Sequence, residues 1–435
     1  MMKIKSILLF SLFGLLSNNT YAQNLSTIYN QAKETNPELL QAKATKQSAF
    51  EAINESRAAL LPQINLDAGF NFIRSDQQGG DLNTSNLGVT LNQSIYNRAN
   101  WINLDIAALN AQASDTNYAS AQQELMLNTV SAYFDILKSM DQLRFIRSEK
   151  KAVARQLEQV KDKFKVGLTP ITDVHDAQAS YDSVLASEII AENNLDNSFE
   201  SLREITGIEY KKLSTLNLSH FSAEKLPNSV SSIEKEALEK NLSIITGQME
   251  QTISKREIKL AESGHLPTLS FNAGYDLTKQ DYQDNVNESL SDTSNDFTAG
   301  INLNVPLYSG GAITSRTKQA QFNFVAKSEA LKNTHRDVIK TIRASFNNIN
   351  ASIGTVHAYQ QVVISAQSAL DANEAGYQVG TRTIVDVLNA TQSLYDAESE
   401  LSSARYDYLL NKVKLKKAVG TLSNEDLSAI NSILN

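Results

Sequence analysis

The chain has 435 residues, 20% of them charged, and a formal net charge of −8. Acidic residues outnumber basic ones and no basic cluster occurs, so a nucleic-acid-binding surface is not expected. Cysteine is absent, which excludes disulfides, thiolate metal sites, a cysteine nucleophile and a lipid-modified cysteine at the mature N-terminus.

Residues 1–22 have the pattern of a secretory signal peptide. Lys3 and Lys5 precede an apolar run over residues 7–16, and Ala22 stands at the expected cleavage site. An apolar run of about ten residues is too short to span a bilayer as a helix. We therefore expect an exported chain that begins at Gln23 and has no transmembrane helix.

Two pairs of alternating segments are the strand candidates. Apolar residues occupy every second position, which predicts strands at about 62–73, 86–96, 267–278 and 297–308. Runs of about ten residues suit transmembrane strands, and the polar segments 74–86 and 278–296 are predicted to be exposed loops. A soluble sheet with one wet face is the alternative. The polar face has scarcely a charge and the hairpins are isolated between helices, which favours the membrane sheet.

Four long segments are predicted to be helices, at about 98–166, 170–206, 312–376 and 381–419. Most of their residues are good helix formers. The first would be about 100 Å long at 1.5 Å per residue, which implies a coiled coil or a similar array. Apolar residues recur at the three-four spacing of a coiled-coil seam. They are Val130, Tyr133, Leu137 and Met140 in the first helix, and Leu394, Ala397, Leu401, Ala404 and Tyr408 in the fourth.

The chain also repeats itself. Leu61-Pro62 matches Leu266-Pro267, residues 88–96 match 300–308, and residues 167–173 match 380–386. The period of about 205–213 residues is too long for a solenoid unit and indicates a duplicated domain. We expect a first repeat over 23–213, a second over 228–423 and a C-terminal tail over 424–435.

Four strands cannot close a membrane barrel alone. Open sheet edges would expose unpaired amides to hydrocarbon, and the smallest single-chain barrels have about eight strands. Several chains must therefore contribute to one barrel. Two chains would give eight strands and three would give twelve, and strand counting leaves both open.

Seven sequence blocks resemble the outer-membrane efflux protein (TolC) family over essentially the whole mature chain. They are NPELLQAKA (36–44), INESRAALLPQI (53–64), LNTVSAYFDIL (127–137), FKVGLTPITDV (164–174), NNLDN (193–197), SFNNINASI (345–353) and YQVGTRTIVDVLNAT (377–391). The resemblance implies an α+β membrane protein: a homotrimer with a twelve-stranded transmembrane β-barrel, a long periplasmic α-helical barrel and a mixed α/β equatorial belt. The belt would include residues 208–229 and the chain after Gly420.

The same resemblance implies a function. The protein would be a passive exit duct in the outer membrane of a Gram-negative bacterium, serving multidrug efflux and type I secretion, with no enzymatic activity and no cofactor. Its partners would be a periplasmic adaptor, an inner-membrane efflux pump or ABC secretion transporter, and outer-membrane lipid. An exported coiled-coil structural or adhesin-type protein without a channel is the alternative. No histidine pair has metal-ligand spacing, and no catalytic constellation is found.

Two short glycine turns join the long helices. Gly167 and Gly380 each follow one helical segment and precede another, where glycine supplies the left-handed residue that ends a helix. Pro170 suits the first turn of the next helix, and Asp173 and Asp386 lie near helix N-termini, where the dipole favours a carboxylate by about 0.3–1 kcal/mol. The turns lie midway between the hairpins, so we expect them at the far, periplasmic end of the tube. A plain structural role for both turns remains open.

The family resemblance implies a channel gate at these turns. Tyr377 would hold Asp173 within one protomer, and Arg382 would reach Thr172 and Asp173 of the neighbour. Asp386 matches one aspartate ring of the family, whereas Asn389 stands where a second ring is usual. Release of the links would let the inner helix pair swing outward like an iris. The exposed turns are candidates for adaptor docking, through Val166, Gly167 and Leu168, and through Val379, Gly380 and Thr381.

The departure at Asn389 gives the first prediction. Rings of carboxylates favour cations in pores, and a trimer with Asn389 lacks one of two such rings. We expect multivalent cations to block the channel more weakly than they block a homologue with two rings, measured as single-channel current in planar bilayers. Equal block at matched ionic strength would contradict the assignment.

Overall fold

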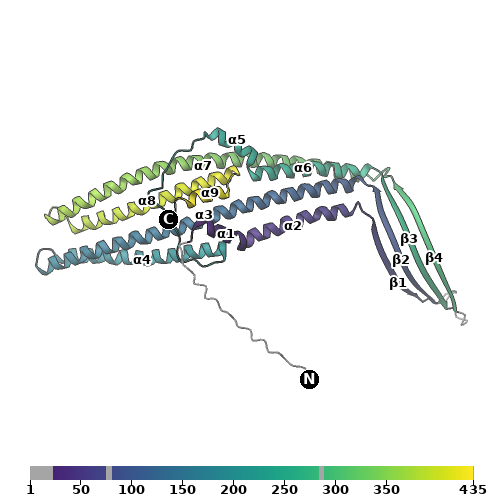
Figure 1. The fold of residues 1–435 in the computed structure, drawn as a ribbon, viewed down its shortest axis with the longest axis horizontal. Coiled ribbons are helices and arrows are strands. Elements are labelled where there is room, and N and C mark those ends of the chain that lie inside the picture. Colours follow the sequence, from purple (N-terminus) through teal and green to yellow (C-terminus); the bar gives the residue numbers. More distant parts are fainter. Residues whose placement is uncertain (1–22, 75–80, 284–288, 435) are drawn as a thin grey trace, which may run out of the picture.

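A computed structural model of the chain describes residues 23–74, 81–283 and 289–434. The predicted signal peptide, residues 1–22, lies outside the described residues. Figure 1 shows an elongated molecule with a sheet at one end and the two helix-joining turns at the other. The predicted distance between the turns and the strands is thereby confirmed.

The sheet contains four antiparallel strands in chain order. They are β1 Gln63–Ile73, β2 Asp81–Tyr96, β3 Thr268–Gln283 and β4 Ser289–Asn304. Pairing of β2 with β3 joins the two hairpins into one surface, while β1 and β4 each have one strand neighbour among the described residues.

Side chains of each kind align across the strands. The register places Leu66, Val89, Tyr275 and Phe297 in one row, and these apolar side chains are 69%, 44%, 47% and 72% exposed. The next row, which faces the opposite side, contains Asp67, Gly88, Asp276 and Asp296. The predicted alternation therefore produces an apolar face near the helices. Toward the hairpin ends the same side of the sheet carries polar residues, among them Lys279 and Asp281.

The strand extents differ from the prediction. Strands β3 and β4 continue into the segment 278–296, which was expected to be a loop, and β2 begins at Asp81 instead of residue 86. Main-chain pairing along a hairpin does not depend on apolar side chains, so the polar residues extend the ladder. At the other end β4 stops at Asn304 instead of residue 308, because Pro306 has no N–H to donate.

Two long helices run the length of the molecule. Helix α3 spans Arg98–Lys165 and α7 spans Ala312–Gln378. Shorter helices follow one another along them (Figure 1): α2 Pro37–Ala58 and α4 Ile171–Thr206 beside α3, and α6 Leu242–Glu262 and α8 Ile384–Val419 beside α7. A 3-10 turn, Ser263–His265, connects α6 to the strands. None of the described helices is both long and apolar enough to cross a membrane.

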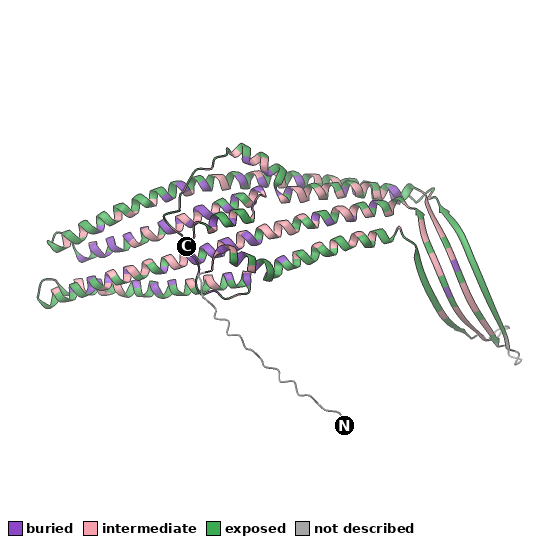
Figure 2. Ribbon diagram, in the orientation of Figure 1, coloured by how far each residue is buried: buried purple, intermediate pink, exposed green. Residues whose placement is uncertain are grey.

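The predicted coiled-coil seams form the core. Tyr133 is fully buried and Tyr408 is 1% exposed, and the other predicted seam residues are buried except Met140, which packs against the core. Figure 2 shows the buried residues concentrated along the middle of the helices, where α3 and α8 meet. Burial of these stripes, and not local propensity, stabilises helices of this length.

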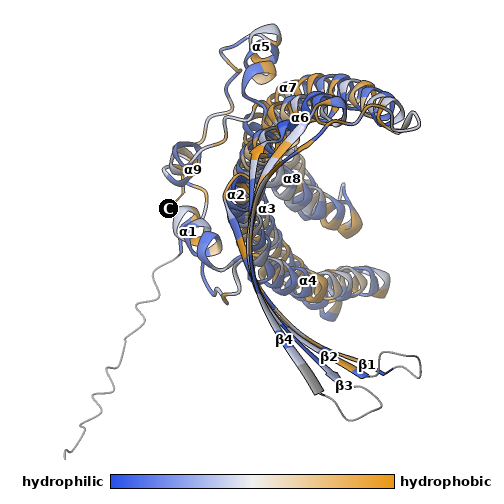
Figure 3. Ribbon diagram, turned by 90° about the vertical axis from the view of Figure 1, so that its right-hand side faces the viewer, coloured by the Kyte–Doolittle hydropathy of each residue, from blue (hydrophilic) through white to orange (hydrophobic). Residues whose placement is uncertain are grey.

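A belt of small elements flanks this core on one side (Figure 3). It contains α1 Leu25–Thr35, α5 Val230–Lys240 and α9 Asn424–Asn431, which lie to one side of the helical wall in Figure 3. Isolated β-bridges link Gln23 with Leu213 and Leu216 with Leu434. The segment expected to be a C-terminal tail, 424–435, thus contains a helix, which begins with a capping box between Ser423 and Asp426.

Two glycines that end helices provide a matched test of packing. Gly207 and Gly420 both have positive φ, of 70° and 88°, but a Cβ on Gly207 would meet nothing within 4 Å, whereas on Gly420 it would lie 2.3 Å from the carbonyl oxygen of Lys240. We expect Gly207→Ala to cost roughly 1–2 kcal/mol of unfolding free energy for the left-handed backbone. Gly420→Ala should cost about 1–3 kcal/mol more, because the added methyl overlaps backbone.

Denaturant unfolding of the detergent-solubilised protein measures both variants. If the two variants had the same denaturant midpoint, the backbone at the α8 terminus would have moved to accommodate the added methyl without cost, and the predicted overlap would be wrong.

Candidate functional site: the helical tip

Both tip turns end their helices with the same hydrogen-bond pattern. After α3, the N–H of Gly167 donates to Phe164 O at 2.9 Å and that of Leu168 to Lys163 O at 2.9 Å. After α7, Gly380 donates to Tyr377 O at 3.3 Å and Thr381 to Gly376 O at 2.9 Å. This is the Schellman motif. Its left-handed residues are Gly167 and Gly380, with φ of 77° and 78°, which confirms the glycine prediction.

The helices that follow begin differently. Helix α8 has a capping box: the amide of Asp386 donates to Thr383 Oγ1 at 3.2 Å, and the amide of Thr383 donates to the Asp386 carboxylate at 2.9 Å. The corresponding position before α4 is Pro170, which has neither an N–H nor a hydroxyl. Asp173 is therefore free of the cap and accepts a hydrogen bond from the Thr169 hydroxyl.

The two aspartates consequently have different chemistry. Hydrogen bonds from the backbone and hydroxyl of Thr383 hold the pKa of Asp386 below its usual range, and Arg382 contributes a smaller effect. Asp386 is engaged within its own helix terminus. Asp173, with one side-chain donor from its own turn, retains acceptor capacity for another partner.

Tyr377 lies beside Asp173 without a hydrogen bond to it. The Tyr377 hydroxyl is buried and has no hydrogen-bond partner among the described residues. Burial raises the pKa of Tyr377, and the charge of Asp173 raises it further, so the two groups are close in space. Lys163 Nζ lies 3.9 Å from the centroid of the Tyr377 ring. The structure therefore brings Tyr377 and Asp173 together, but the donor on Asp173 is Thr169.

The remaining candidate gate residues are exposed at the tip. Thr172 and Arg382 are exposed, and no ion pair involves Arg382 in the described part of the chain. The Arg382 side chain packs close to Gly376, where a Cβ would lie 2.6 Å from Arg382 Cγ. Neither Thr172 nor Arg382 is joined to Asp173 within this chain.

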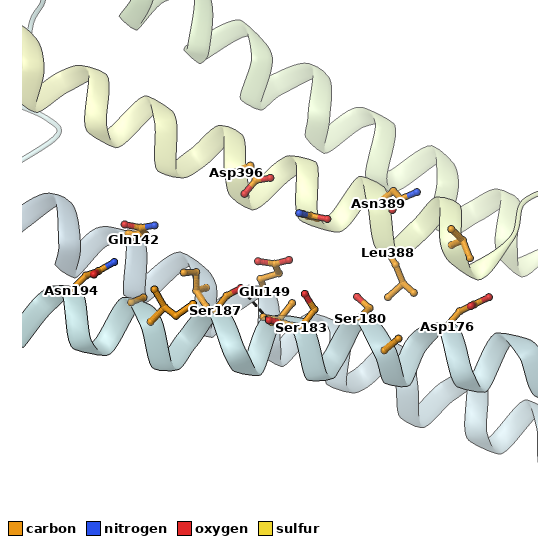
Figure 4. Close-up of a pocket in the computed structure, with 17 residues that line it drawn as sticks. Gln142, Glu149, Asp176, Ser180, Ser183, Ser187, Asn194, Leu388, Asn389 and Asp396 are labelled. Carbon is orange, nitrogen blue, oxygen red and sulfur yellow. Dashed lines mark hydrogen bonds between the residues drawn. The ribbon is translucent and has the colours of Figure 1, made fainter.

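Asn389 lines a groove between α4 and α8. The groove has a volume of about 530 Å³ and is floored by α3, and Figure 4 shows Asn389 at one end of it and Asp396 further along α8. Serines of α4 form much of the opposite wall, and Glu149 of α3 lies between the α4 wall and the α8 wall. The groove extends from the tip toward the belt.

The candidate docking residues form an apolar end to the molecule. Val166, Leu168 and Val379 are 69%, 76% and 76% exposed, which is unusual for three large apolar side chains placed on tight turns. Gly167, Gly380 and Thr381 beside them are also exposed.

Sequence reasoning missed three contributors to this site. Thr383 was recognisable from its spacing to Asp386, because a Ser or Thr three residues before an acidic residue is typical of a capping box. Thr169 and Lys163 carry no such signal, since their contacts with Asp173 and Tyr377 depend on how the turn and the neighbouring helix pack.

Comparisons with known proteins agree with this architecture. The family model for outer membrane efflux proteins matches residues 28–208 and 234–421. The chain belongs to the outer membrane efflux protein family. It is 50% identical over 436 residues to outer membrane protein TolC of Vibrio cholerae, covering 99% of this chain and 98% of that protein.

More distant relatives share the full length as well. Alkaline protease secretion protein AprF of Pseudomonas aeruginosa is 26% identical over 96% of this chain and 90% of its own length. The CmeC outer membrane channel of Campylobacter jejuni has the same fold, with a TM-score of 0.79 at 18% identity, covering 95% of this chain and 90% of that chain.

Family membership decides the function class. The protein is an outer-membrane channel of a Gram-negative bacterium with a large periplasmic portion, and it serves as an exit duct for efflux. It is not an enzyme. The alternative of an exported coiled-coil adhesin without a channel was wrong.

The capping box at α8 gives a prediction. Thr383→Ala removes the hydroxyl acceptor and should cost about 1 kcal/mol of helix-terminus stability, with faster hydrogen exchange at the first amides of α8. Because the pKa of Asp386 is depressed in the folded state, its contribution is present above its unfolded pKa and is lost as pH falls through its folded pKa.

Thr172→Ala is the matched control, since Thr172 is an exposed first-turn threonine of α4 that does not cap the helix. Equal exchange rates in Thr383→Ala and Thr172→Ala would contradict a capping role for Thr383.

Proposed function

We propose that three copies of this chain form one duct through the outer membrane, and the apolar part of the four-stranded sheet, next to the helices, carries this proposal. Leu66, Val89, Tyr275 and Phe297 expose a row across all four strands that water would not solvate well and lipid would cover. Strands β1 and β4 each have a free edge, which in hydrocarbon needs a partner. Pairing β1 of one copy with β4 of the next satisfies both edges, and the family resemblance favours three copies and twelve strands.

The helical end supports the partners that we propose. The duct ends in a helical tip about 100 Å from the sheet, as judged from the length of α3 at 1.5 Å per residue. A channel in the outer membrane has no energy source of its own, so a periplasmic adaptor must join it to an inner-membrane pump or ABC secretion transporter. The exposed apolar turns, with Val166, Leu168 and Val379 at their apices, are the surfaces we assign to the adaptor.

Relatives support two classes of cargo. The family is described as efflux proteins, and AprF is named for alkaline protease secretion. We propose that this protein likewise serves both small-molecule efflux and type I protein secretion, with the choice made by the inner-membrane partner.

The chain is proposed to be a duplicated domain whose two copies have diverged at the tip. Pro170 in the first copy leaves Asp173 available, while Thr383 in the second engages Asp386. The buried Tyr377 hydroxyl has no hydrogen-bond partner among the described residues and is influenced by the charge of Asp173, so we assign Asp173 as its acceptor in the closed tip. Arg382 is exposed and has no ion pair in the described part of the chain, and we assign it to Thr172 and Asp173 of a neighbouring copy. Together these links would hold the tip closed.

Bilayer conductance tests both the duct and its gate. Tyr377→Phe combined with Arg382→Ser removes the hydroxyl and the guanidinium that we assign to the closed tip, so single-channel conductance in planar bilayers should rise. Lys165→Ser is the control, because Lys165 pairs with Asp162 on its own helix at 2.8 Å and should leave conductance unchanged.

Two failures are distinguishable. Absence of any conductance from an assembled oligomer would overturn the duct, whereas unchanged conductance in the double variant would overturn only the gate assignment.

A further inference from the structure

Helix α8 is joined to α3 by a series of polar contacts. The two helices are antiparallel, and a polar contact joins them at four levels along their seam. From the belt toward the tip, these contacts are Lys417 with Glu124, Lys138 with Asp407 at 2.5 Å, Asp141 with Ser402 and with Tyr406 at 3.1 Å, and Gln156 with Thr391 at 2.9 Å. At every one of these levels a donor on one helix faces an acceptor on the other.

One level of the seam places two acids together. Glu149 of α3 lies between the levels of Asp141 and Gln156, and Asp396 of α8 lies between those of Ser402 and Thr391. Figure 4 shows Glu149 directed from α3 into the groove beneath Asp396. Glu149 is only 8% exposed, and neither carboxylate has a hydrogen bond or an ion pair in the part of the chain that the structure describes.

Among the residues that the structure describes, no cation pairs with either of these two acids. On α3 itself, Arg147 and Lys150 both form ion pairs with Glu188 of α4, and the distance from Arg147 Nε to the Glu188 carboxylate is 3.1 Å. Both cations are therefore directed toward α4. On the same helix Arg144 pairs with Asp141 at 3.0 Å. Two ionised carboxylates facing each other in a partly buried seam repel.

Other titratable groups at this level do not change the balance. Helix α4 presents Ser183 and Ser187 beside Glu149, and its acid Asp176 lies further along the groove toward the tip (Figure 4). Helix α8 adds Glu398, which lies within the influence of Arg144, and Tyr395, which lies near Glu149 and Arg155. The titratable groups that α8 brings to this level are therefore acids and a phenol, and α4 adds serine hydroxyls.

We propose that Glu149 and Asp396 form a proton-operated spacer between α3 and α8. With a proton on Glu149, its carboxyl becomes a donor and Asp396 an acceptor, so this level of the seam matches the four others. When Glu149 ionises, repulsion between the two carboxylates favours separation of α8 from α3. The inference rests on the proposed gate, in which the inner helix pair moves outward, and it adds proton control at a level above the tip.

The electrostatics give the direction of the pH response. Burial, and then the charge of Asp396, raise the pKa of Glu149 from its ordinary value of 4.5 to about 7. Burial also raises the pKa of Asp396. The packed seam thus binds the proton more tightly than a separated, solvated seam. The proton on Glu149 therefore stabilises the packed seam fully below pH 4.5, the ordinary pKa of a solvated glutamate. This stabilisation falls as pH rises from about 4.5 to about 7 and changes little above that range.

Absence of native cysteine allows a direct test of the seam. Lys151 on α3 and Ser393 on α8 are exposed and lie near the level of the acid pair. Cysteines at these two positions, spin-labelled and diluted with unlabelled protomers, report the α3–α8 distance by pulsed electron resonance. One proton can shift a two-state ratio by up to about tenfold per pH unit. We expect the separated population to increase at least tenfold relative to the packed one between pH 4.5 and 7.5.

Three variants make the test specific. Glu149→Gln cannot ionise and should remain packed across this range, and Asp396→Asn should weaken the pH response. Glu158→Gln removes the same charge from an exposed position of α3 and should respond as the unmodified protein does. A distance distribution independent of pH, or an equal response in Glu149→Gln and Glu158→Gln, would overturn the spacer.

Bilayer conductance separates this inference from the function on which it rests. If the spacer acts on the gate, conductance should rise from pH 4.5 to 7.5 in the unmodified protein and in Glu158→Gln but not in Glu149→Gln. Loss of conductance in all of them, with the distance change intact, would overturn the proposed duct and leave the spacer standing.

Discussion

The constraint on which the architecture depends is the unpaired edge of a membrane sheet. Each chain supplies four strands with an apolar face, and the two outer strands each have an edge whose amides and carbonyls pair with no other strand among the described residues. In water these groups would bind solvent, but in hydrocarbon they need another strand. The sheet therefore makes assembly of several chains a condition of insertion. The helices, which continue from the same chain segments, are then brought into a ring as a consequence of closing the barrel.

Stability and movement are divided along the helices. Near the belt, α3 and α8 share a core that includes Tyr133 and Tyr408 and are also joined by Lys138–Asp407 and Asp141–Ser402. Toward the tip the core is smaller, the groove between α4 and α8 opens, and two acids face each other across the seam. Local opening is least costly where buried apolar contacts are fewest. The fold thus concentrates rigidity at the belt and leaves the tip as the part that can rearrange.

The two tip turns show how one motif acquires two roles. Both use the same glycine-terminated helix end, yet a proline in one copy and a threonine in the other decide what the following aspartate does. Asp386 stabilises its own helix terminus, whereas Asp173 remains available to a partner outside it. The difference arises from a single missing N–H and hydroxyl at Pro170, and it makes the first copy the acceptor side of the proposed gate.

Local periodicity and backbone chemistry made several elements readable from consecutive residues. Alternation identified all four strands, three-four spacing identified the seams of α3 and α8, and Gly167 and Gly380 marked the turns, because each signal is encoded in consecutive residues. Tertiary structure alone decided the pairing of β2 with β3, the extension of the hairpins through polar residues, and the contacts of Thr169 and Lys163 at the tip. It alone placed Glu149 opposite Asp396, since residues almost 250 positions apart meet only through the packing register of two antiparallel helices.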